Sequence, residues 1–282
     1  MIKTSFAAIQ VRALASALFL TFMPLTYATE AEITLGSVAM DIPAEMVNRL
    51  TPLTKYLSQK TGIPVGYQAS PNLISTIDYF GANKTQIAYL TPVAYLEAHE
   101  KYGAIPLVNP LTRGKATFSL VIAVRKDSSI KTMRELRGKK FAFGDEKALL
   151  QQAVVARVGL KLEDFAAYSF LKHYDNIAKA VINGDFDAGI LKDTVAEKFE
   201  PQGLRIIHIS PPLPSYLFAV SQHLSPETVA KLKSAMLALN TDTPENKAVL
   251  SALDTGYDGF VTVEDKDYET VRKLIAPFKN KK

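Results

Sequence analysis

Residues 86–108 read QIAYLTPVAYLEAHEKYGAIPLV, and this stretch indicates the fold class. Its first part, residues 86–90, is an apolar run of strand length, and Pro92 then opens a helix because proline is favoured at the first helical position. Gly103 marks the end of that helix, as glycine commonly does, and residues 104–108 are a second strand. A strand, a helix and a second strand in succession predict a parallel pair joined by a crossover.

The same alternation continues on both sides of this stretch. Residues 118–124 (FSLVIAV) are almost continuously apolar, which is typical of a strand buried on both faces. The other strands are expected at residues 32–39, 65–68, 140–143, 168–171, 188–191, 204–209 and 217–220. A helix is expected at residues 44–60, because Met46, Leu50, Leu53 and Leu57 would lie on one face of it. The other helices are expected at residues 72–80, 132–137, 146–158, 175–183, 193–200, 226–239, 244–253 and 265–276.

Two such series predict an α/β protein with two lobes, each a parallel sheet with helices on both faces. The first lobe is expected to begin with residues 29–117, and the second to occupy residues 118–214. Residues 215–282, a return strand and a helical tail, are expected to complete the first lobe. Ligands of open α/β sheets bind beyond the carboxyl ends of the strands, so a hinge between the lobes would close around a solute.

The first 28 residues have the features of a secretory signal. Lys3 and Arg12 precede an apolar run at residues 13–23, and a stretch of small residues ends at Ala28. The alternative is an uncleaved membrane anchor, although the apolar run is short for a bilayer span. Cleavage after Ala28 would lower the formal net charge from +5 to +3. We therefore expect a periplasmic protein.

The composition excludes several classes of protein. The chain has no cysteine, which excludes disulfides, thiolate metal sites and cysteine nucleophiles. Its charged residues, 22% of the total, are of both signs and interspersed, without the basic patch of a nucleic-acid-binding protein. The chain is 48% hydrophobic, and no second apolar segment approaches the length of a membrane span.

Motifs for catalysis are also missing from the sequence. It contains no glycine-rich phosphate loop, no G-x-G-x-x-G and no G-x-S-x-G. His99-Glu100 begins like a zinc-protease motif but lacks the second histidine, and the other histidines are scattered. Acidic pairs such as Glu163-Asp164 are better explained by helix capping. We expect no enzyme activity, no metal and no cofactor.

Several segments together resemble one family, the phosphate-, phosphite- and phosphonate-binding periplasmic proteins of ABC importers. Residues 86–108 look like that family's strand–turn–helix segment. Residues 118–145, FSLVIAVRKDSSIKTMRELRGKKFAFGD, are similar to its crossing strand and to the strand that ends in FAFGD. His173 with AVINGDFDAGIL at residues 180–191, and ISPPLPSYLFAV at residues 209–220, match in the same order.

The resemblance covers essentially the whole chain after the signal. It implies a type II periplasmic binding protein fold and a monomer that delivers a small molecule to an ABC permease. A periplasmic sensor acting on a membrane histidine kinase or a similar receptor is the alternative. An exported enzyme on the same scaffold would have only His173 and Asp193 to work with.

The sequence departs from this family at the expected ligand cradle. In the family, the FAFGD strand leads to a run of Ser and Thr at a helix start, where hydroxyls and free N–H groups hold the phosphonate oxygens. Here the corresponding run is Glu146-Lys147-Ala148-Leu149-Leu150. Each donor lost to a charged acceptor costs roughly 1–3 kcal/mol, so three would cost about 3–9 kcal/mol, or some two to six decades of affinity. Tight phosphonate binding is not expected.

Cleft residues follow from the resemblance. Leu73 and Leu90 fall where the family has aromatic side chains, and Tyr216 falls near its acidic group. The expected ligand-binding residues are Leu73, Leu90, Thr91, Tyr95, Phe118, Lys147, Ala148, Leu149, His173, Asp193 and Tyr216, with Lys192 as a further candidate. Plainer roles stay open for several: helix capping for Thr91 and Asp193, packing for Tyr95 and Leu149, and solvation for Lys147. Leucines in the cleft would favour a solute with an apolar part and one anionic end near Lys147.

Overall fold

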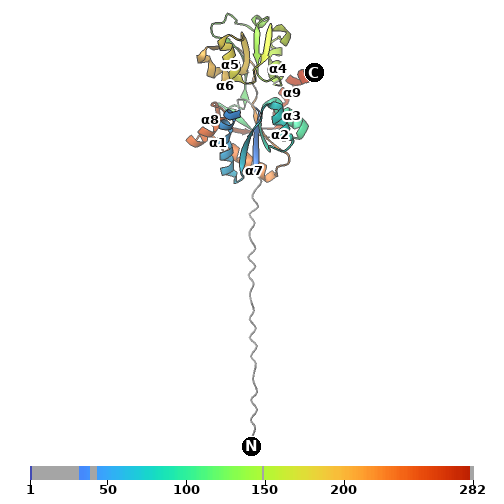
Figure 1. Cartoon of the computed structure of the whole chain (residues 1–282), viewed down its shortest axis with the longest axis vertical. Helices are drawn as coiled ribbons and strands as arrows, with labels where there is room; N and C mark the ends of the chain where they lie inside the picture. The colour runs from blue at the N-terminus through green and yellow to red at the C-terminus, as the bar shows by residue number, and fades with distance from the viewer. Residues whose placement is uncertain (2–31, 39–42, 148, 280–282) are drawn as a thin grey trace. The chain divides into compact units, whose positions relative to one another are not determined.

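Two open α/β sheets form the body of the chain (Figure 1). The computed structural model describes Met1 and residues 32–38, 43–147 and 149–279. Apart from Met1, the expected signal at residues 1–28 lies outside the described part. Among the described residues, no helix has both the length and the apolar character needed to cross a bilayer.

The first sheet has six strands. In spatial order they are β13 (Tyr257–Thr262), β4 (Ile105–Thr112), β12 (Leu217–Val220), β3 (Ile87–Leu90), β1 (Ile33–Ser37) and β2 (Val65–Ala69). β1 is parallel to both β2 and β3, as predicted for strands joined by helical crossovers. β12 is antiparallel to β3 and β4, and β13 is antiparallel to β4.

Helices cover this sheet by burying one apolar face each. They are α1 (Pro43–Thr61), α2 (Leu73–Gly81), α3 (Pro92–Tyr102), α7 (Pro226–Leu237) and α8 (Pro244–Leu253). α1 packs against α7 and α8, and α2 packs against α3. The predicted inward face of α1 is confirmed, because Met46, Leu50, Leu53 and Leu57 are all buried. α3 begins at Pro92 and is followed by Gly103 with φ of 66°, so both predicted ends of that helix are also confirmed.

The second sheet has five strands. In spatial order they are β10 (Leu204–Ile209), β6 (Leu120–Arg125), β9 (Ala188–Lys192), β7 (Lys140–Phe143) and β8 (Ala167–Phe170). β7 is parallel to β8 and β9, whereas β6 is antiparallel to β9 and β10. Its helices are α4 (Leu149–Arg157), α5 (Tyr174–Asn183) and α6 (Asp193–Phe199). The 3-10 turns among the described residues are η1 (Met133–Leu136), η2 (Leu162–Asp164), η3 (Glu200–Gln202) and η4 (Asp265–Tyr268).

Two segments connect the two sheets, and the last helix contacts both series. β5 (Thr117–Phe118) leads from the first sheet to the second, and β11 (Leu213–Pro214) leads back. These two short strands pair with each other in antiparallel register, with Phe118 opposite Leu213. The last helix, α9 (Glu269–Lys279), packs against α4 of the second series and α3 of the first. The lobe boundaries expected at residues 117 and 214 stay a prediction.

The sheets differ from the all-parallel arrangement that the strand–helix alternation predicts. Both sheets are mixed. β12 and β6 each enter a sheet from a connecting segment at the edge where the parallel strands end, so each runs antiparallel to its neighbour β3 or β9. β13 also lies within the tail that we expected to be helical. It completes the edge of the first sheet beside β4.

Candidate functional site

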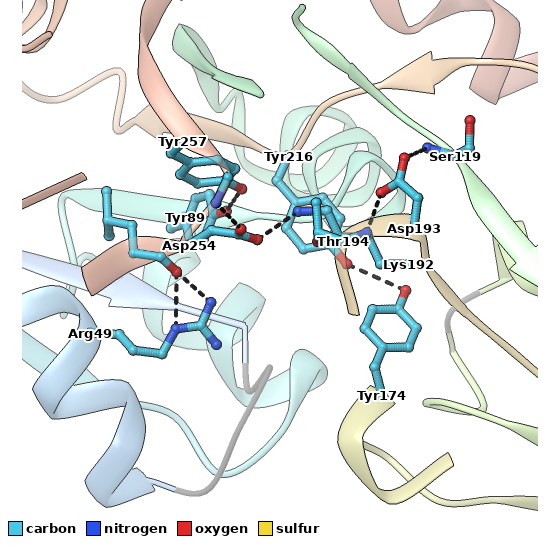
Figure 2. A network of polar contacts seen from close by, with 12 residues as sticks. Arg49, Tyr89, Ser119, Tyr174, Lys192, Asp193, Thr194, Tyr216, Asp254 and Tyr257 are labelled. Carbon is cyan, nitrogen blue, oxygen red and sulfur yellow. Dashed lines mark hydrogen bonds and ion pairs between the residues drawn. The ribbon is translucent and has the colours of Figure 1, made fainter. Parts of the chain in front are cut away.

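Strand ends from both sheets meet in one cluster of polar and aromatic side chains (Figure 2). Lys192 is the last residue of β9 in the second sheet. Tyr89 lies in β3, Tyr216 directly precedes β12 and Tyr257 begins β13, all in the first sheet. Asp254 directly follows α8. The cluster therefore lies where open α/β sheets bind ligands, beyond the ends of the parallel strands.

The centre of the cluster is an ion pair between the two sheets. The Lys192 Nζ atom lies 2.9 Å from Asp254 Oδ2, and the exposed fractions of the two side chains are 8% and 14%. The same ammonium lies 5.1 Å from the ring centre of Tyr257 and 5.6 Å from that of Tyr216. Aromatic rings at this distance attract a cation. Lys192 is thus bound by one carboxylate and two rings of the first sheet.

The pair holds both groups in their charged forms. Burial alone would lower the pKa of the Lys192 ammonium, but Asp254 together with Tyr89 and Asp193 outweighs it, and the pKa lies above its ordinary value. Burial alone would raise the pKa of the Asp254 carboxyl, but Lys192 and the backbone N–H of Gly256 outweigh it, and that pKa is lowered. At neutral pH the pair is therefore ionised and has no net charge.

Asp254 is fixed from behind by its own loop. The Gly256 N–H donates to Asp254 Oδ1 over 2.9 Å, so both carboxylate oxygens are engaged. The Arg49 guanidinium of α1 donates through Nε to the Leu253 carbonyl oxygen over 3.0 Å, as Figure 2 shows. The end of α8 is thus tied to α1, which positions the carboxylate toward Lys192.

Neutral phenols surround the pair. The hydroxyls of Tyr89 and Tyr257 are hydrogen-bonded to each other, and those of Tyr174 and Tyr216 lie 3.5 Å apart. Burial raises the pKa of Tyr89 and Tyr216 well above the ordinary value, so these hydroxyls stay protonated. Phe118 meets Tyr216 edge to face at 5.5 Å between ring centres. Two predicted cleft residues, Phe118 and Tyr216, therefore lie together beside Lys192.

Asp193 lies next to the pair but serves the second sheet. One of its oxygens accepts the N–H of Ser119 over 2.7 Å, and the other accepts the N–H of Thr194 over 2.8 Å. It is the first residue of α6, with Lys192 in the N-cap position. Its carboxylate joins the end of β9 to the segment that enters β6.

The start of α4 has the chemistry expected from its sequence. The Lys147 side chain is exposed, and its backbone N–H donates to Asp145 Oδ1 over 2.8 Å. α4 begins at Leu149, which is half-buried against the core, and Leu150 is buried. Ala148 lies outside the described residues. Leu150 is therefore the helix's inward residue, and Leu149 is the leucine with an accessible surface.

The remaining predicted residues have separate surroundings. Thr91 is the N-cap of α3 and accepts the Ala94 N–H over 3.2 Å. Tyr95 is fully buried, and its hydroxyl donates to Asp265 of η4 over 2.8 Å, away from the Lys192 cluster. His173 precedes α5, and its Nδ1 atom is buried without a hydrogen-bond partner among the described residues. Leu73 and Leu90 are buried at the start of α2 and the end of β3.

Two cavities lie against the loop that carries Asp254, and each is lined by residues of both series. A cavity of about 220 Å³ is lined by Arg49, Asp175, Thr194, Val195, Lys198, Ser251, Ala252, Leu253, Asp254 and Thr255. A cavity of about 430 Å³ is lined by Arg113, Thr194, Glu197, Thr241, Lys247, Ser251, Thr255, Gly256, Tyr257 and Asp258. An ion pair between Arg113 and Glu197 crosses the second cavity's rim. Charged and hydroxyl groups thus dominate both linings.

Sequence reasoning missed Tyr89, Asp254 and Tyr257. Tyr89 lies within a quoted strand, QIAYL, but nothing in the strand pattern distinguishes it from core. Asp254 and Tyr257 lie in a tail that we expected to be helical. Among the described residues, no group of three or more His, Cys, Asp or Glu side chains could hold a metal ion.

The fold, with strand ends of two α/β sheets meeting at a polar cluster, is that of the two-lobed periplasmic binding proteins. A family model described as "ABC transporter, phosphonate, periplasmic substrate-binding protein" matches residues 35–268, and the chain belongs to this family. Its members are substrate-binding components of importers, not enzymes, and they act in the periplasm.

Individual relatives agree with this assignment. The chain is 26% identical over 273 residues to the phosphate-import protein PhnD of Mycolicibacterium smegmatis, covering 86% of this chain and 84% of the relative. The structure of PhnD1 from Prochlorococcus marinus in complex with methylphosphonate has a TM-score of 0.80 at 19% identity, covering 88% of this chain and 98% of that one. A binding protein component of a Pseudomonas aeruginosa phosphonate ABC transporter has a TM-score of 0.77 at 21% identity, covering 87% and 85%.

Proposed function

We propose that this chain captures a small solute between the strand ends of its two sheets and delivers it, as a monomer, to an ABC permease. The observation that supports this most directly is the meeting of Lys192 from one sheet with Asp254 and the tyrosines from the other. A solute held at this place would contact both lobes, so its binding would favour the closed arrangement.

The solute that fits the start of α4 has an apolar part. The run Lys147-Ala148-Leu149-Leu150 contains no hydroxyl, so a phosphonate would find only backbone N–H donors there. Leu149 is half-buried and offers an apolar contact, and the exposed Lys147 offers one positive charge. A monoanion with an alkyl or aryl part is the ligand class that these residues favour.

The ligand class can be tested on protein purified from the periplasm. Native mass spectrometry would reveal a co-purified solute, and calorimetry would compare inorganic phosphate, methylphosphonate and phosphonates with longer alkyl chains. We expect affinity to rise along that series and to be weakest for phosphate. Tighter binding of phosphate than of any alkylated anion would contradict the proposed ligand class.

Restoring hydroxyls at the start of α4 should restore oxyanion binding. The double substitution Ala148→Ser with Leu149→Thr adds two donors and leaves the buried Leu150 in the core. Two donors to a charged acceptor are worth roughly 2–6 kcal/mol, so we expect methylphosphonate affinity to rise at least about tenfold by calorimetry. Ala156→Ser, an exposed position near the other end of α4, is the matched control and should leave affinity unchanged. An equal gain in the control would contradict the placement of the cradle.

A sensory role on a membrane histidine kinase stays the alternative to transport. Neighbouring genes help to separate the two, because genes for a permease and an ATPase favour transport and a gene for a histidine kinase favours sensing. A histidine kinase gene in their place would overturn delivery to a permease without affecting solute capture.

A further inference from the structure

We propose that the Asp254 carboxylate acts as an internal anion, which occupies Lys192 in place of a ligand oxyanion and so excludes dianions such as phosphate from the cleft. This inference rests on the proposed function, because it concerns the specificity of the same cleft. Asp254 would then determine specificity, and the positive charge of Lys192 would already be neutralised by it.

The two charged groups come from different series of strands and helices. Lys192 ends β9 of the second sheet, and Asp254 follows α8, which packs on the first sheet against β13. Their 2.9 Å contact therefore links the two series in the way that an anion bound between them would. A cation at a strand end of the cleft would attract an anionic solute, and the described cation that is buried there is Lys192.

The charge of Lys192 is already balanced by the Asp254 carboxylate. One side of the ammonium meets Asp254, and the rings of Tyr216 and Tyr257 lie within 5.6 Å and 5.1 Å of it. Both side chains are largely buried, so water screens their charges only weakly. A dianion placed beside Lys192 would also lie close to the Asp254 carboxylate and be repelled by it.

The charged groups around the Lys192–Asp254 pair nearly balance one another. Asp193 of α6 adds a second carboxylate on the Lys192 side, with its oxygens held by backbone N–H groups. A further cation on the Asp254 side is Arg49, which donates to the Leu253 carbonyl. These neighbours leave the centre of the cleft without an excess of positive charge. Such a centre favours solutes that carry at most one negative charge, with that charge placed away from the centre, near Lys147.

The loop around Asp254 fixes the orientation of its carboxylate. The Gly256 N–H holds Asp254 Oδ1, and Arg49 holds the carbonyl of the preceding residue. The carboxylate is therefore oriented toward Lys192 before any solute arrives. A side chain positioned in this way competes with an external anion at a very high effective concentration.

The test is to remove the internal anion and to ask whether an external one takes its place. In Asp254→Asn the side chain keeps its shape but loses its charge, which leaves Lys192 available. We expect calorimetry with inorganic phosphate and with methylphosphonate to show at least about a tenfold gain in affinity over the starting protein. The double variant Asp254→Asn/Lys192→Met should lose this gain, because the cation is absent.

Two controls make the result specific. Asp127→Asn removes the same charge from an exposed ion pair with Arg125 and should leave phosphate affinity unchanged. Circular dichroism melts show that each variant is folded. If Asp254→Asn does not fold, Asp254→Ser, which is smaller and also neutral, takes its place in the same titrations.

The outcomes distinguish this inference from the proposed function. An Asp254→Asn protein that binds phosphate no better than the starting protein overturns the internal anion, and so does a gain that survives Lys192→Met. If solute capture by the starting protein is found and the gain is not, only the internal anion fails. If the starting protein binds no solute but Asp254→Asn gains phosphate binding through Lys192, the internal anion stands and the proposed function fails.

Discussion

At the scale of single residues, the buried Lys192–Asp254 pair differs from an ion pair inside one core. Removing one partner from a buried pair typically costs 3–5 kcal/mol, because the other charge stays buried without a partner. Here the partners belong to different sheets, so opening of the cleft can return the remaining charge to water. Loss of either partner should therefore favour an open arrangement more than it destabilises either sheet.

The pair should make stability depend on pH in acid. The Asp254 pKa is lowered below its ordinary 3.8 in the folded protein, so its contribution is complete above that value and is lost as the pH falls through the folded pKa. The Lys192 pKa is raised above 10.5, so its contribution is complete below that value and is lost only as the pH rises through the raised pKa. Between about pH 5 and pH 9 the pair's contribution should be constant.

Thermal unfolding followed by circular dichroism can check this. Compared with the starting protein, Asp254→Asn should lose less stability between about pH 5 and pH 3, because it lacks one carboxylate with a lowered pKa. The exposed-site variant Asp127→Asn provides the comparison. Parallel acid curves for Asp254→Asn and the starting protein would contradict the assignment.

The residue-level site could be predicted only in part. Phe118 and Tyr216 were predicted as cleft residues from the resemblance, and the structure brings them together beside Lys192. The pairing of Lys192 with Asp254 joins residues 62 positions apart, and no local pattern carries that information. The pairing depends on how α8 and its following turn are placed, which is set by packing against α1 and β13.

At the scale of elements, β9 and α5 are packed unusually closely, and this contact positions the strand that ends in Lys192. Gly189 lies in β9 opposite Ala123 of β6, and an added Cβ there would overlap the Ile177 side chain of α5. Gly189→Ala should therefore lower the free energy of unfolding by about 1–3 kcal/mol through overpacking. Denaturant unfolding would measure the change.

Gly259→Ala is the matched control for this substitution. Gly259 is also a strand glycine, in β13, but an added Cβ would lie 3.5 Å from the Leu239 carbonyl oxygen and 3.8 Å from Leu111, which are ordinary contacts. Its unfolding free energy should change by less than about 0.5 kcal/mol. Equal losses at both glycines would show that strand glycines, and not the contact with α5, account for the effect.

Elements with strong local signals were predicted well, and elements defined by their partners were not. α8 spans Pro244–Leu253, the range expected from its sequence, with Thr243 as N-cap. β13 has the sequence YDGFVT, in which Tyr, Phe, Val and Thr favour a strand but Asp and Gly interrupt the run, so its local strand signal is weak. It is a strand because β4 offers an edge for it to pair with.

At the scale of the whole molecule, the last helix contacts both series and so provides a second link between them besides the ion pair. α9 packs against α4 and α3, with Val271 and Ile275 fully buried. Ile275→Ala should lower the free energy of unfolding by about 2–5 kcal/mol, since it leaves a cavity between the helices. Scanning calorimetry would measure this, with the half-buried Leu274→Ala as the comparison, for which a smaller loss is expected. A larger loss at Leu274 would contradict the packing of α9.

The paired connecting strands have a mechanical consequence. β5 and β11 are hydrogen-bonded side by side, with Phe118 opposite Leu213, so the two polypeptide links cannot slide past each other independently. A two-stranded ribbon of this kind can bend, but its hydrogen bonds resist sliding of one strand along the other. A closing motion about this ribbon would bring the same atoms back to the same neighbours, with the Asp254 carboxylate beside the Lys192 ammonium.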